Sequence, residues 1–332
     1  MTKKRIAING FGRIGRAVFR IALNKKNIEV VAINDLTDSA TLAQLLKYDS
    51  AQKRIENKVS SNKKGIVVDG ITYPVFTQKD PTLLPWKDLK VDVVLECTGV
   101  FRTYEDAQKH MQAGAKKVII SAPAKGENVE TIVLGVNEEK IKKSKNVYDI
   151  ASCTTNCIAP VMKIISDNFT IEKALMTTVH AYTADQNLMD GPHKDLRRAR
   201  AAAMNIIPTS TGAAIAVTRA IPKLKGKFDG FAIRVPVIDG SLSDITIKLK
   251  ENVTVEKIND LFIKMSKDKK FKGILTTTKD PIVSCDIIGN PYSSIVDLSL
   301  TNVMDGNLLK VVAWYDNEWG FSNRMLELCE RI

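Results

Sequence analysis

The chain has 332 residues, of which 44% are hydrophobic and 26% charged, and this is enough for two domains with cores of ordinary size. Lys and Arg outnumber Asp and Glu by 49 to 37, an excess that favours the attraction of anions such as phosphorylated metabolites. Aromatic residues make up only 6% and are not clustered for base stacking, so we expect no required nucleic-acid partner.

The N-terminal region begins directly with a strand-like apolar run at residues 4–9. No apolar segment with a small-residue cleavage site precedes it, as a secretory signal would require. No uninterrupted apolar run in the chain reaches the length of a membrane-spanning helix. We therefore expect a cytoplasmic protein without a membrane partner.

The first 150 residues alternate strand-like runs with helical patterns. A helical stripe follows residues 4–9, and a second strand is predicted at 30–33. Further strands are predicted at 91–96, 117–121, 133–136 and 147–150, with a helix over 104–115. This alternation is typical of an α/β fold with a Rossmann-type, doubly wound parallel sheet.

After residue 150 the pattern changes. A helix is predicted over 153–168, with shorter helices at 211–220 and 255–267. Longer strands are predicted at 173–182, 228–237, 243–250 and 308–315. These indicate an α+β domain with a mixed or antiparallel sheet. The basic segment at 187–207 has no clear period and is predicted to be a loop, which at this length is usually functional.

A glycine-rich turn with the G-x-G-x-x-G spacing, Gly10 to Gly15, follows the first predicted strand and opens the first helix. Gly10 permits the tight turn, Gly12 permits close approach of a pyrophosphate, and Gly15 lets the helix pack on the strand. The helix N-terminus then offers amide donors to phosphate. Asp35 lies 20 residues beyond Gly15, where a carboxylate binds ribose hydroxyls and repels a 2′-phosphate. The motif therefore predicts an NAD site.

The five cysteines are scattered, so neither a disulfide framework nor a metal site is expected. Cys153 lies at a predicted helix start behind Ser152, a suitable N-cap, and we expect the helix dipole to lower the pKa of its thiol. A thiolate there would attack carbonyl groups. Such a nucleophile needs a base, and His180, at the end of a predicted strand, is the best placed of the three histidines.

Several motifs together resemble phosphorylating glyceraldehyde-3-phosphate dehydrogenases of the bacterial and eukaryotic type. The resemblance extends over essentially the whole chain and includes NGFGRIG (9–15), ASCTTNC (151–157), HAYT (180–183), AIRVP (232–236) and WYDNEWG (314–320). It implies oxidation of D-glyceraldehyde 3-phosphate to 1,3-bisphosphoglycerate with NAD and inorganic phosphate, through a Cys153 thioester. We expect an NAD-binding domain over residues 1–150, joined by a C-terminal helix over 317–332, and a catalytic domain over 151–316.

The resemblance also implies roles for individual residues. The cofactor set adds backbone contacts from Arg13 and Ile14 to the glycines and Asp35, with Ser121 and Asn317 near the nicotinamide. Lys79 stands near the adenine, where many members of the family have arginine. Two anion sites are implied, one for the substrate phosphate and one for inorganic phosphate. Their residues would be Ser152, Thr154, Thr183, Arg198, Thr211, Gly212 and Arg234.

The loop at 187–207 resembles the family's S-shaped loop, which packs against the cofactor of a neighbouring subunit and implies a homotetramer. The nearest alternative is a related enzyme acting on erythrose 4-phosphate. A semialdehyde dehydrogenase of related architecture would be NADP-linked, and Asp35 argues against it. A separate surface-binding role of the basic charge would be additional to the enzymatic one.

Overall fold

A computed structural model describes residues 3–332, which form two compact units. The first unit contains the chain as far as Ile132, together with Glu139–Ala151 and Ser322–Ile332. The second unit contains Val133–Glu138 and Ser152–Phe321. Each unit is built around its own β-sheet.

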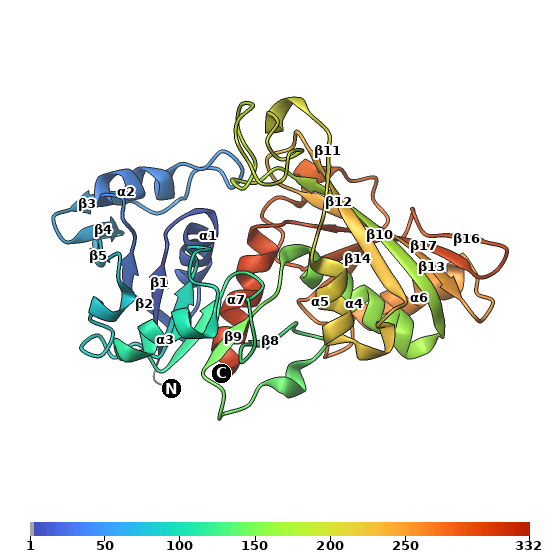
Figure 1. The fold of residues 1–332 in the computed structure, drawn as a ribbon, viewed down its shortest axis with the longest axis horizontal. Helices are drawn as coiled ribbons and strands as arrows, with labels where there is room; N and C mark the ends of the chain where they lie inside the picture. The colour runs from blue at the N-terminus through green and yellow to red at the C-terminus, as the bar shows by residue number, and fades with distance from the viewer. Residues whose placement is uncertain (1–2) are drawn as a thin grey trace. The chain divides into compact units, whose positions relative to one another are not determined.

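The sheet of the first unit has nine strands in the order β3-β4-β5-β2-β1-β6-β7-β9-β8 (Figure 1). From β5 to β8 every neighbouring pair is parallel, which confirms the predicted doubly wound sheet. The strands are β1 (Lys4–Asn9), β2 (Ile28–Asn34), β3 (Val59–Asn62), β4 (Gly65–Val68), β5 (Ile71–Phe76), β6 (Val93–Glu96), β7 (Lys117–Ile120), β8 (Glu130–Thr131) and β9 (Val147–Asp149).

Three helices lie entirely in the first unit: α1 (Arg13–Ala22), α2 (Ser39–Lys47) and α3 (Tyr104–Gln112). The unit also includes the C-terminal helix from Ser322 onward. Asp38 caps α2 by accepting from the amides of Ala40 and Thr41, and a capping box of Thr103 and Asp106 begins α3. The sequence analysis did not predict α2 or the antiparallel strands β3 and β4. The buried side chains on the α3 side form one cluster around Trp86, Val94 and Val118.

One predicted strand is wrong. Residues 133–136 form a turn in which Gly135 has a φ of +80°, and the nearby edge strand is the shorter β8. The apolar run Val133–Val136 is buried as a turn, because burial alone does not distinguish a strand from a packed loop.

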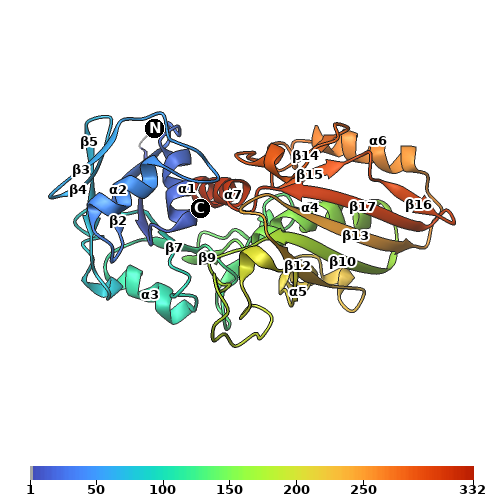
Figure 2. The same ribbon diagram turned by 90° about the horizontal axis from the view of Figure 1, so that it is seen from above.

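The second unit carries an eight-stranded mixed sheet, which confirms the predicted α+β character. Seven strands follow the order β11-β12-β10-β13-β17-β15-β14, and β16 pairs with β17 (Figure 2). The β10–β12 and β14–β15 pairs are parallel and the others antiparallel. The strands are β10 (Ile171–Ala181), β11 (Ile207–Thr209), β12 (Phe228–Val235), β13 (Ser241–Leu249), β14 (Leu275–Thr278), β15 (Ser294–Asp297), β16 (Asn302–Met304) and β17 (Leu308–Tyr315).

Helix α4 (Cys153–Asn168) packs on β10, β13, β15 and β17, and α5 (Ala213–Ala220) packs on α4 and β12. Helix α6 (Val255–Ser266) packs on β14, and α7 (Trp319–Arg331) ends the chain. Short 3₁₀ segments occupy Pro81–Leu83, Glu138–Lys140, Ala202–Met204, Pro222–Leu224 and Ser284–Ile287. No helix between residues 3 and 332 is both long enough and apolar enough to span a membrane.

Candidate active site

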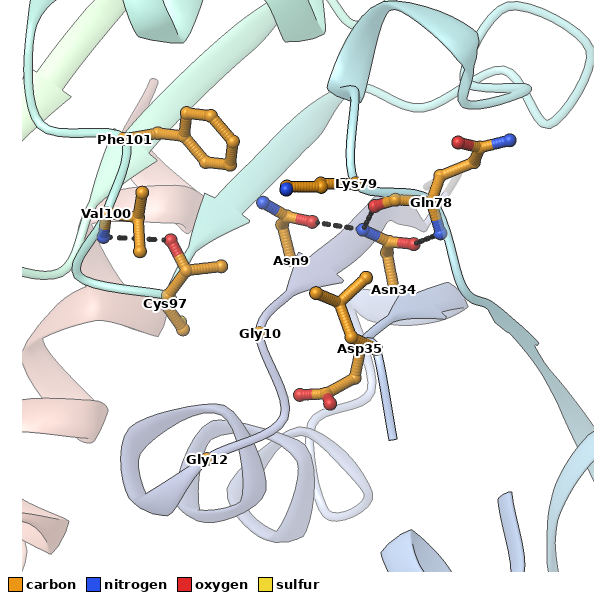
Figure 3. Close-up of a pocket in the computed structure, with 12 residues that line it drawn as sticks. Asn9, Gly10, Gly12, Asn34, Asp35, Gln78, Lys79, Cys97, Val100 and Phe101 are labelled. Atoms are coloured by element: carbon orange, nitrogen blue, oxygen red, sulfur yellow. Dashed lines mark hydrogen bonds between the residues drawn. The ribbon is translucent and has the colours of Figure 1, made fainter. Parts of the chain in front are cut away.

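A pocket of about 560 Å³ opens at the carboxyl ends of the parallel strands of the first unit (Figure 3). Ligands of open α/β sheets bind at this edge. Of the residues predicted from the glycine motif and the resemblance, Gly10, Gly12, Asp35 and Lys79 line this pocket. Its other lining residues are Asn9, Asn34, Leu36, Gln78, Cys97, Thr98, Val100 and Phe101.

The three glycines of the motif differ in what a side chain at each position would meet. Gly10 has a φ of +88°, and a Cβ there would lie 2.7 Å from the Thr98 amide nitrogen. A Cβ on Gly15 would lie 2.1 Å from the Gly10 carbonyl oxygen, so α1 could not approach β1. A Cβ on Gly12 would meet no atom within 4 Å, because it faces the open pocket. This open space at a helix start fits the pyrophosphate of a dinucleotide.

The Asp35 carboxylate is oriented by the backbone on both sides. Its Oδ2 accepts from the Phe11 amide at 2.7 Å, and its Oδ1 accepts from the Thr37 amide at 2.9 Å. The first bond connects the predicted ribose-binding residue to the glycine turn, which lies 24 residues earlier. A fixed carboxylate at this point in the pocket fits a dinucleotide with free ribose hydroxyls.

The remaining cofactor candidates lie in three places. Arg13 and Ile14 follow Gly12 in the first turn of α1. The Arg13 side chain forms an ion pair with Asp49 at 2.6 Å, so only its backbone is offered to a ligand. Ser121 follows β7, and its side chain opposes the rise that burial causes in the pKa of the Cys97 thiol beside the pocket. Asn317 belongs to the second unit, where its Oδ1 accepts from the Ser241 hydroxyl at 2.7 Å.

Cys153 is the first residue of α4, as the sequence predicted. Ser152 is the N-cap, and its hydroxyl oxygen accepts from the Thr155 amide at 3.1 Å. Thr154 is buried in the same turn, where its hydroxyl lies 2.9 Å from that of Tyr315. Cys157 is fully buried one turn later, as expected of a packed thiol.

The structure brings Cys153 and His180 together within the second unit. The Cys153 Sγ lies 3.4 Å from the His180 Nε2. On the other side of the ring, Nδ1 lies 2.6 Å from the Ala181 carbonyl oxygen and 2.8 Å from the Arg234 Nη1. Nδ1 therefore faces both an acceptor, the Ala181 carbonyl oxygen, and a donor, the Arg234 guanidinium, which also donates to that carbonyl. In the tautomer with its proton on Nδ1, which donates to Ala181, the imidazole presents the Nε2 lone pair to the thiol. This is the geometry of a nucleophile with its base.

Burial disfavours the charged form of both reacting groups. It raises the pKa of the Cys153 thiol to about 11, although Arg234 and the Thr154 amide oppose the increase. Burial, with the charges of Arg234 and Arg198, lowers the pKa of His180 to about 3. The sequence predicted a lowered thiol pKa from the helix start alone. That prediction is wrong, because desolvation of the thiolate outweighs the neighbouring donors.

Positive charge and free donors surround this pair. Arg234 donates to the Ala181 carbonyl, while its buried Nε has no acceptor among residues 3–332. Arg198 is bound to Asp185, Asp195 and Thr209. Its positive charge nevertheless contributes to lowering the pKa of both His180 and Arg234.

The other anion-site candidates lie on loops and at a helix start of the same unit. Thr183 lies just beyond the end of β10. Gly212 is the exposed N-cap of α5, and the hydroxyl of the preceding Thr211 accepts from the Ala213 amide at 3.2 Å. Open amides at a helix start suit an anion. In the part of the chain that the structure describes, no cluster of three His, Cys, Asp or Glu residues could hold a metal ion.

Sequence reasoning missed Tyr315, whose buried hydroxyl lies 2.9 Å from those of both Thr154 and Thr178. Its ring packs edge-on against His180, with the ring centroids 5.9 Å apart. It also missed most of the pocket lining, including Asn9 and Asn34. A signal was present, because each asparagine is the polar last residue of a strand and directly follows an apolar run.

Two family models match the chain: "Glyceraldehyde 3-phosphate dehydrogenase, NAD binding domain" over residues 4–104, and the C-terminal domain of the same family over 152–317. The chain is 55% identical to the glyceraldehyde-3-phosphate dehydrogenase of Thermotoga maritima, covering 99% of this chain and 98% of that protein. It is 53% identical to glyceraldehyde-3-phosphate dehydrogenase 2 of Streptomyces avermitilis, covering 98% and 97%. The Geobacillus stearothermophilus enzyme is 52% identical, covering 99% and 98%.

Proposed function

Because the chain belongs to the glyceraldehyde-3-phosphate dehydrogenase family, we propose that it oxidises D-glyceraldehyde 3-phosphate through a thioester on Cys153. The products are 1,3-bisphosphoglycerate and NADH, formed with NAD⁺ and inorganic phosphate. The contact of 3.4 Å between the Cys153 Sγ and the His180 Nε2 is the observation that carries this proposal.

The reaction begins with attack of the Cys153 sulfur on the aldehyde carbon. His180 Nε2 accepts the thiol proton as the C–S bond forms, so neither buried group needs to be charged beforehand. The backbone amide of Cys153 and the protonated His180 then donate to the oxyanion. The product of this step is a thiohemiacetal on Cys153.

The second step removes a hydride and a proton from the thiohemiacetal. Bound NAD⁺ supplies the acceptor for the hydride. His180 takes the hydroxyl proton, which leaves a thioester on the sulfur. Inorganic phosphate attacks the thioester carbon, and its oxygen replaces the sulfur while its proton is released to solvent. The acyl phosphate departs, and the Cys153 sulfur takes the proton held by His180.

The pocket of the first unit is proposed to hold NAD. Gly10, Gly12, Arg13 and Ile14 would bind the pyrophosphate through the backbone, and Asp35 the adenosine ribose. Lys79 would contact the adenine end, and Ser121 and Asn317 the nicotinamide. The NAD-binding domain would correspond to the first unit and the catalytic domain to the second. The predicted boundaries at 150 and 317 then move to 151 and 321, and Val133–Glu138 joins the catalytic domain.

The two anion sites are proposed to draw on the residues around Cys153. Arg234 offers its Nε donor, Gly212 the amides at the start of α5, and Arg198 its charge. The hydroxyls of Ser152, Thr154, Thr183 and Thr211 would complete the sites. The four-carbon aldehyde erythrose 4-phosphate is not favoured, because the relatives reported above are all named for the three-carbon reaction.

We further propose a homotetramer in the cytoplasm, where NAD⁺ and phosphorylated sugars occur. The loop at 187–207 supports the assembly, because it exposes several large apolar side chains to solvent in the single chain. These are Leu188, Met189, Leu196, Met204 and Ile206.

The test is NADH formation from glyceraldehyde 3-phosphate, followed by absorbance with phosphate present and then withheld. We expect sustained turnover with phosphate and, without it, a single burst matching the number of Cys153 sites. Sustained NADH formation without phosphate would mean that water takes the acyl group, and it would refute the phosphorylating reaction.

A further inference from the structure

Five residues form a hydrogen-bonded chain across the floor of the dinucleotide pocket. We call Gln78, Asn34, Asn9, Glu96 and Thr98 the polar brace. Four of them line the pocket, and Glu96 lies buried beneath it at the end of β6. The brace thus spans from the loop after β5, across the ends of β2 and β1, to the loop after β6.

The half of the brace on the β2 side joins the side-chain amides of Asn9 and Asn34 to the backbone of Gln78. Asn34 Nδ2 donates to the Gln78 carbonyl at 2.9 Å and to the Asn9 Oδ1 at 2.7 Å. The Gln78 amide donates back to the Asn34 Oδ1 at 2.9 Å. Figure 3 draws the Asn9–Asn34 and Asn34–Gln78 bonds as dashed lines. Since Asp35 follows Asn34 directly, this half also holds the backbone of the proposed ribose-binding residue.

The half of the brace on the β6 side centres on the Glu96 carboxylate. Asn9 Nδ2 donates to its Oε2 at 2.5 Å. The Thr98 amide donates to its Oε1 at 2.7 Å, and the Thr98 hydroxyl donates to the same oxygen. The Val100 amide donates to the Thr98 hydroxyl oxygen at 3.1 Å. The loop after β6, which forms this wall of the pocket, is therefore also connected to Glu96 through Thr98.

A fourth donor reaches Glu96 from the core. Trp86 Nε1 can only donate, and it lies 3.1 Å from the His110 Nδ1, so that nitrogen is the acceptor. His110 therefore carries its proton on Nε2, which lies 3.2 Å from the Glu96 Oε2. Trp86 and His110 are fully buried, and Glu96 is 1% exposed. All the partners of Glu96 in this network are donors, which is the pattern of an ionised carboxylate.

We propose that Glu96 is a positioning residue of the dinucleotide pocket: its buried carboxylate, through Asn9 and Thr98, holds the two walls at the spacing that NAD requires. The β-sheet sets the distance between the strands, but the loops that carry Asp35, Lys79 and Val100 begin where the sheet ends. Backbone hydrogen bonds continue only one step past the strands, as from the Asp35 amide to the Phe76 carbonyl and from the Cys97 amide to the Asn9 carbonyl, and the brace adds side-chain bonds beyond them. This inference rests on the proposed binding of NAD in this pocket.

Glu96→Gln is the sharpest test, because it keeps the shape of the side chain but replaces an acceptor with a donor. In one amide orientation the new NH₂ faces Asn9 and His110, both donors. In the other it faces the Thr98 amide, which cannot reverse. Asn9 cannot turn over without losing Asn34. One wall of the pocket must therefore be released in either orientation.

NAD binding to the full-length protein would be measured by titration calorimetry, with circular dichroism to verify folding. We expect the Kd for NAD to rise about tenfold, while kcat at saturating NAD stays within about twofold of the wild type. Glu56→Gln is the matched control, because it makes the same change at an exposed site of the same unit. An unchanged Kd in folded Glu96→Gln would overturn the proposal, as would an equal rise in the control.

A double-mutant cycle with Asn34→Ala separates positioning from direct contact. If both residues act through one brace, the double variant should bind NAD about as weakly as the worse single variant. Multiplicative losses would contradict the brace. If Glu96→Gln fails to fold, Thr98→Ala takes its place in the cycle with the same two outcomes. Wild-type protein that binds NAD but does not oxidise the aldehyde would refute the proposed reaction and leave the brace intact.

Discussion

Cys153 and His180 are separated by 27 residues in sequence, yet their reacting atoms are 3.4 Å apart. Cys153 begins α4, and His180 lies at the end of β10, the strand that follows. Arg234 reaches the same ring because β12 pairs with β10 in parallel register, with Arg234 opposite His180. The three side chains are thus brought together by one helix start and one strand pair.

We predict that Cys153→Ser lowers dehydrogenase turnover by about 1,000-fold or more, and His180→Asn by about 100-fold or more. Both variants should bind NAD within about twofold of the wild type, since the pocket lies in the other unit. Steady-state kinetics and calorimetry measure the two effects. Near-normal turnover of Cys153→Ser would refute the covalent mechanism.

The rate of thiol alkylation tests the role of His180 separately. Because burial keeps the Cys153 thiol protonated near neutral pH, its reaction with iodoacetamide should depend on proton removal by His180. We expect slower alkylation of His180→Asn between pH 6 and 8. Equal rates in the two proteins throughout this range would exclude an activating role.

Asp239 is a buried carboxyl group that was not predicted from the sequence. Its neighbours are the carboxylates of Asp316 and Glu318. When ionised, Asp239 also raises the pKa of the Cys153 thiol. Asp316 accepts hydrogen bonds from the amides of Gly289, Glu318 and Trp319. Burial and the two neighbouring carboxylates raise the pKa of Asp239 well above its usual range.

This raised pKa gives a stability prediction with a definite sign. The unfolded Asp239 loses its proton near pH 4, but the folded group keeps it, so its contribution falls as pH rises from about 4 towards the folded pKa. Asp239→Asn should therefore gain stability relative to wild type between pH 6 and 9, by on the order of 1 kcal/mol per pH unit. Denaturant unfolding of both proteins at pH 6 and pH 9 measures this. A difference in unfolding free energy between variant and wild type that is the same at both pH values would contradict the prediction.

At the scale of elements, the β1–α1 turn shows how one motif contains separable functions. Gly15 is needed for packing between α1 and β1, since its Cβ position lies 2.1 Å from the Gly10 carbonyl oxygen. Gly12 has no such constraint from the protein and ordinary negative φ of −71°. Alanine at the two positions should therefore have different consequences.

We predict that Gly15→Ala destabilises the fold by on the order of 2–3 kcal/mol, because backbone must move. Gly12→Ala should change stability by no more than about 1 kcal/mol. It should nevertheless weaken NAD binding about tenfold, because the added methyl group enters the space proposed for the pyrophosphate. Thermal unfolding and calorimetry on both variants test the contrast, and equal loss of stability would refute it.

At the scale of the whole molecule, the loop at 187–207 is the segment on which the proposed assembly rests. Its own hydrogen bonds give it a defined shape: Arg198 and Asp195 both bind Thr209, and Arg200 binds Asp190. Its apolar side chains nevertheless point outward, with Leu196 81% and Met204 82% exposed. An ordered loop with an apolar exterior is typical of a subunit interface.

We predict that the wild-type protein sediments as four chains of 36.7 kDa each. Met204→Asp should shift it to smaller species, because it places an unpaired charge in the interface. Leu83→Asp, at an apolar side chain that is 66% exposed outside the loop, is the control and should remain a tetramer. Sedimentation of the wild type as a monomer would contradict the proposed assembly.

The sequence by itself determined what depends on local chemistry. The glycine turn, the Ser152 cap and the α4 start are encoded within a few residues, and β1, α4 and β17 have the predicted bounds. Cys153 and His180 were identified because few other residues could perform their chemistry. The short strands β3 and β4 and helix α2 were missed because their apolar patterns are brief, and Val133–Val136 was misassigned because a buried turn is as apolar as a strand.

Only the tertiary structure decided what depends on burial and on distant partners. The pKa of Cys153 is raised because the site removes it from water, which a helix position cannot reveal. Asp239 and Asp316 meet across 77 positions, and Asn9 and Glu96 across 87. Polar residues of this kind acquire their protonation and their hydrogen bonds from neighbours that the fold supplies, because desolvation and donor geometry are properties of three-dimensional packing.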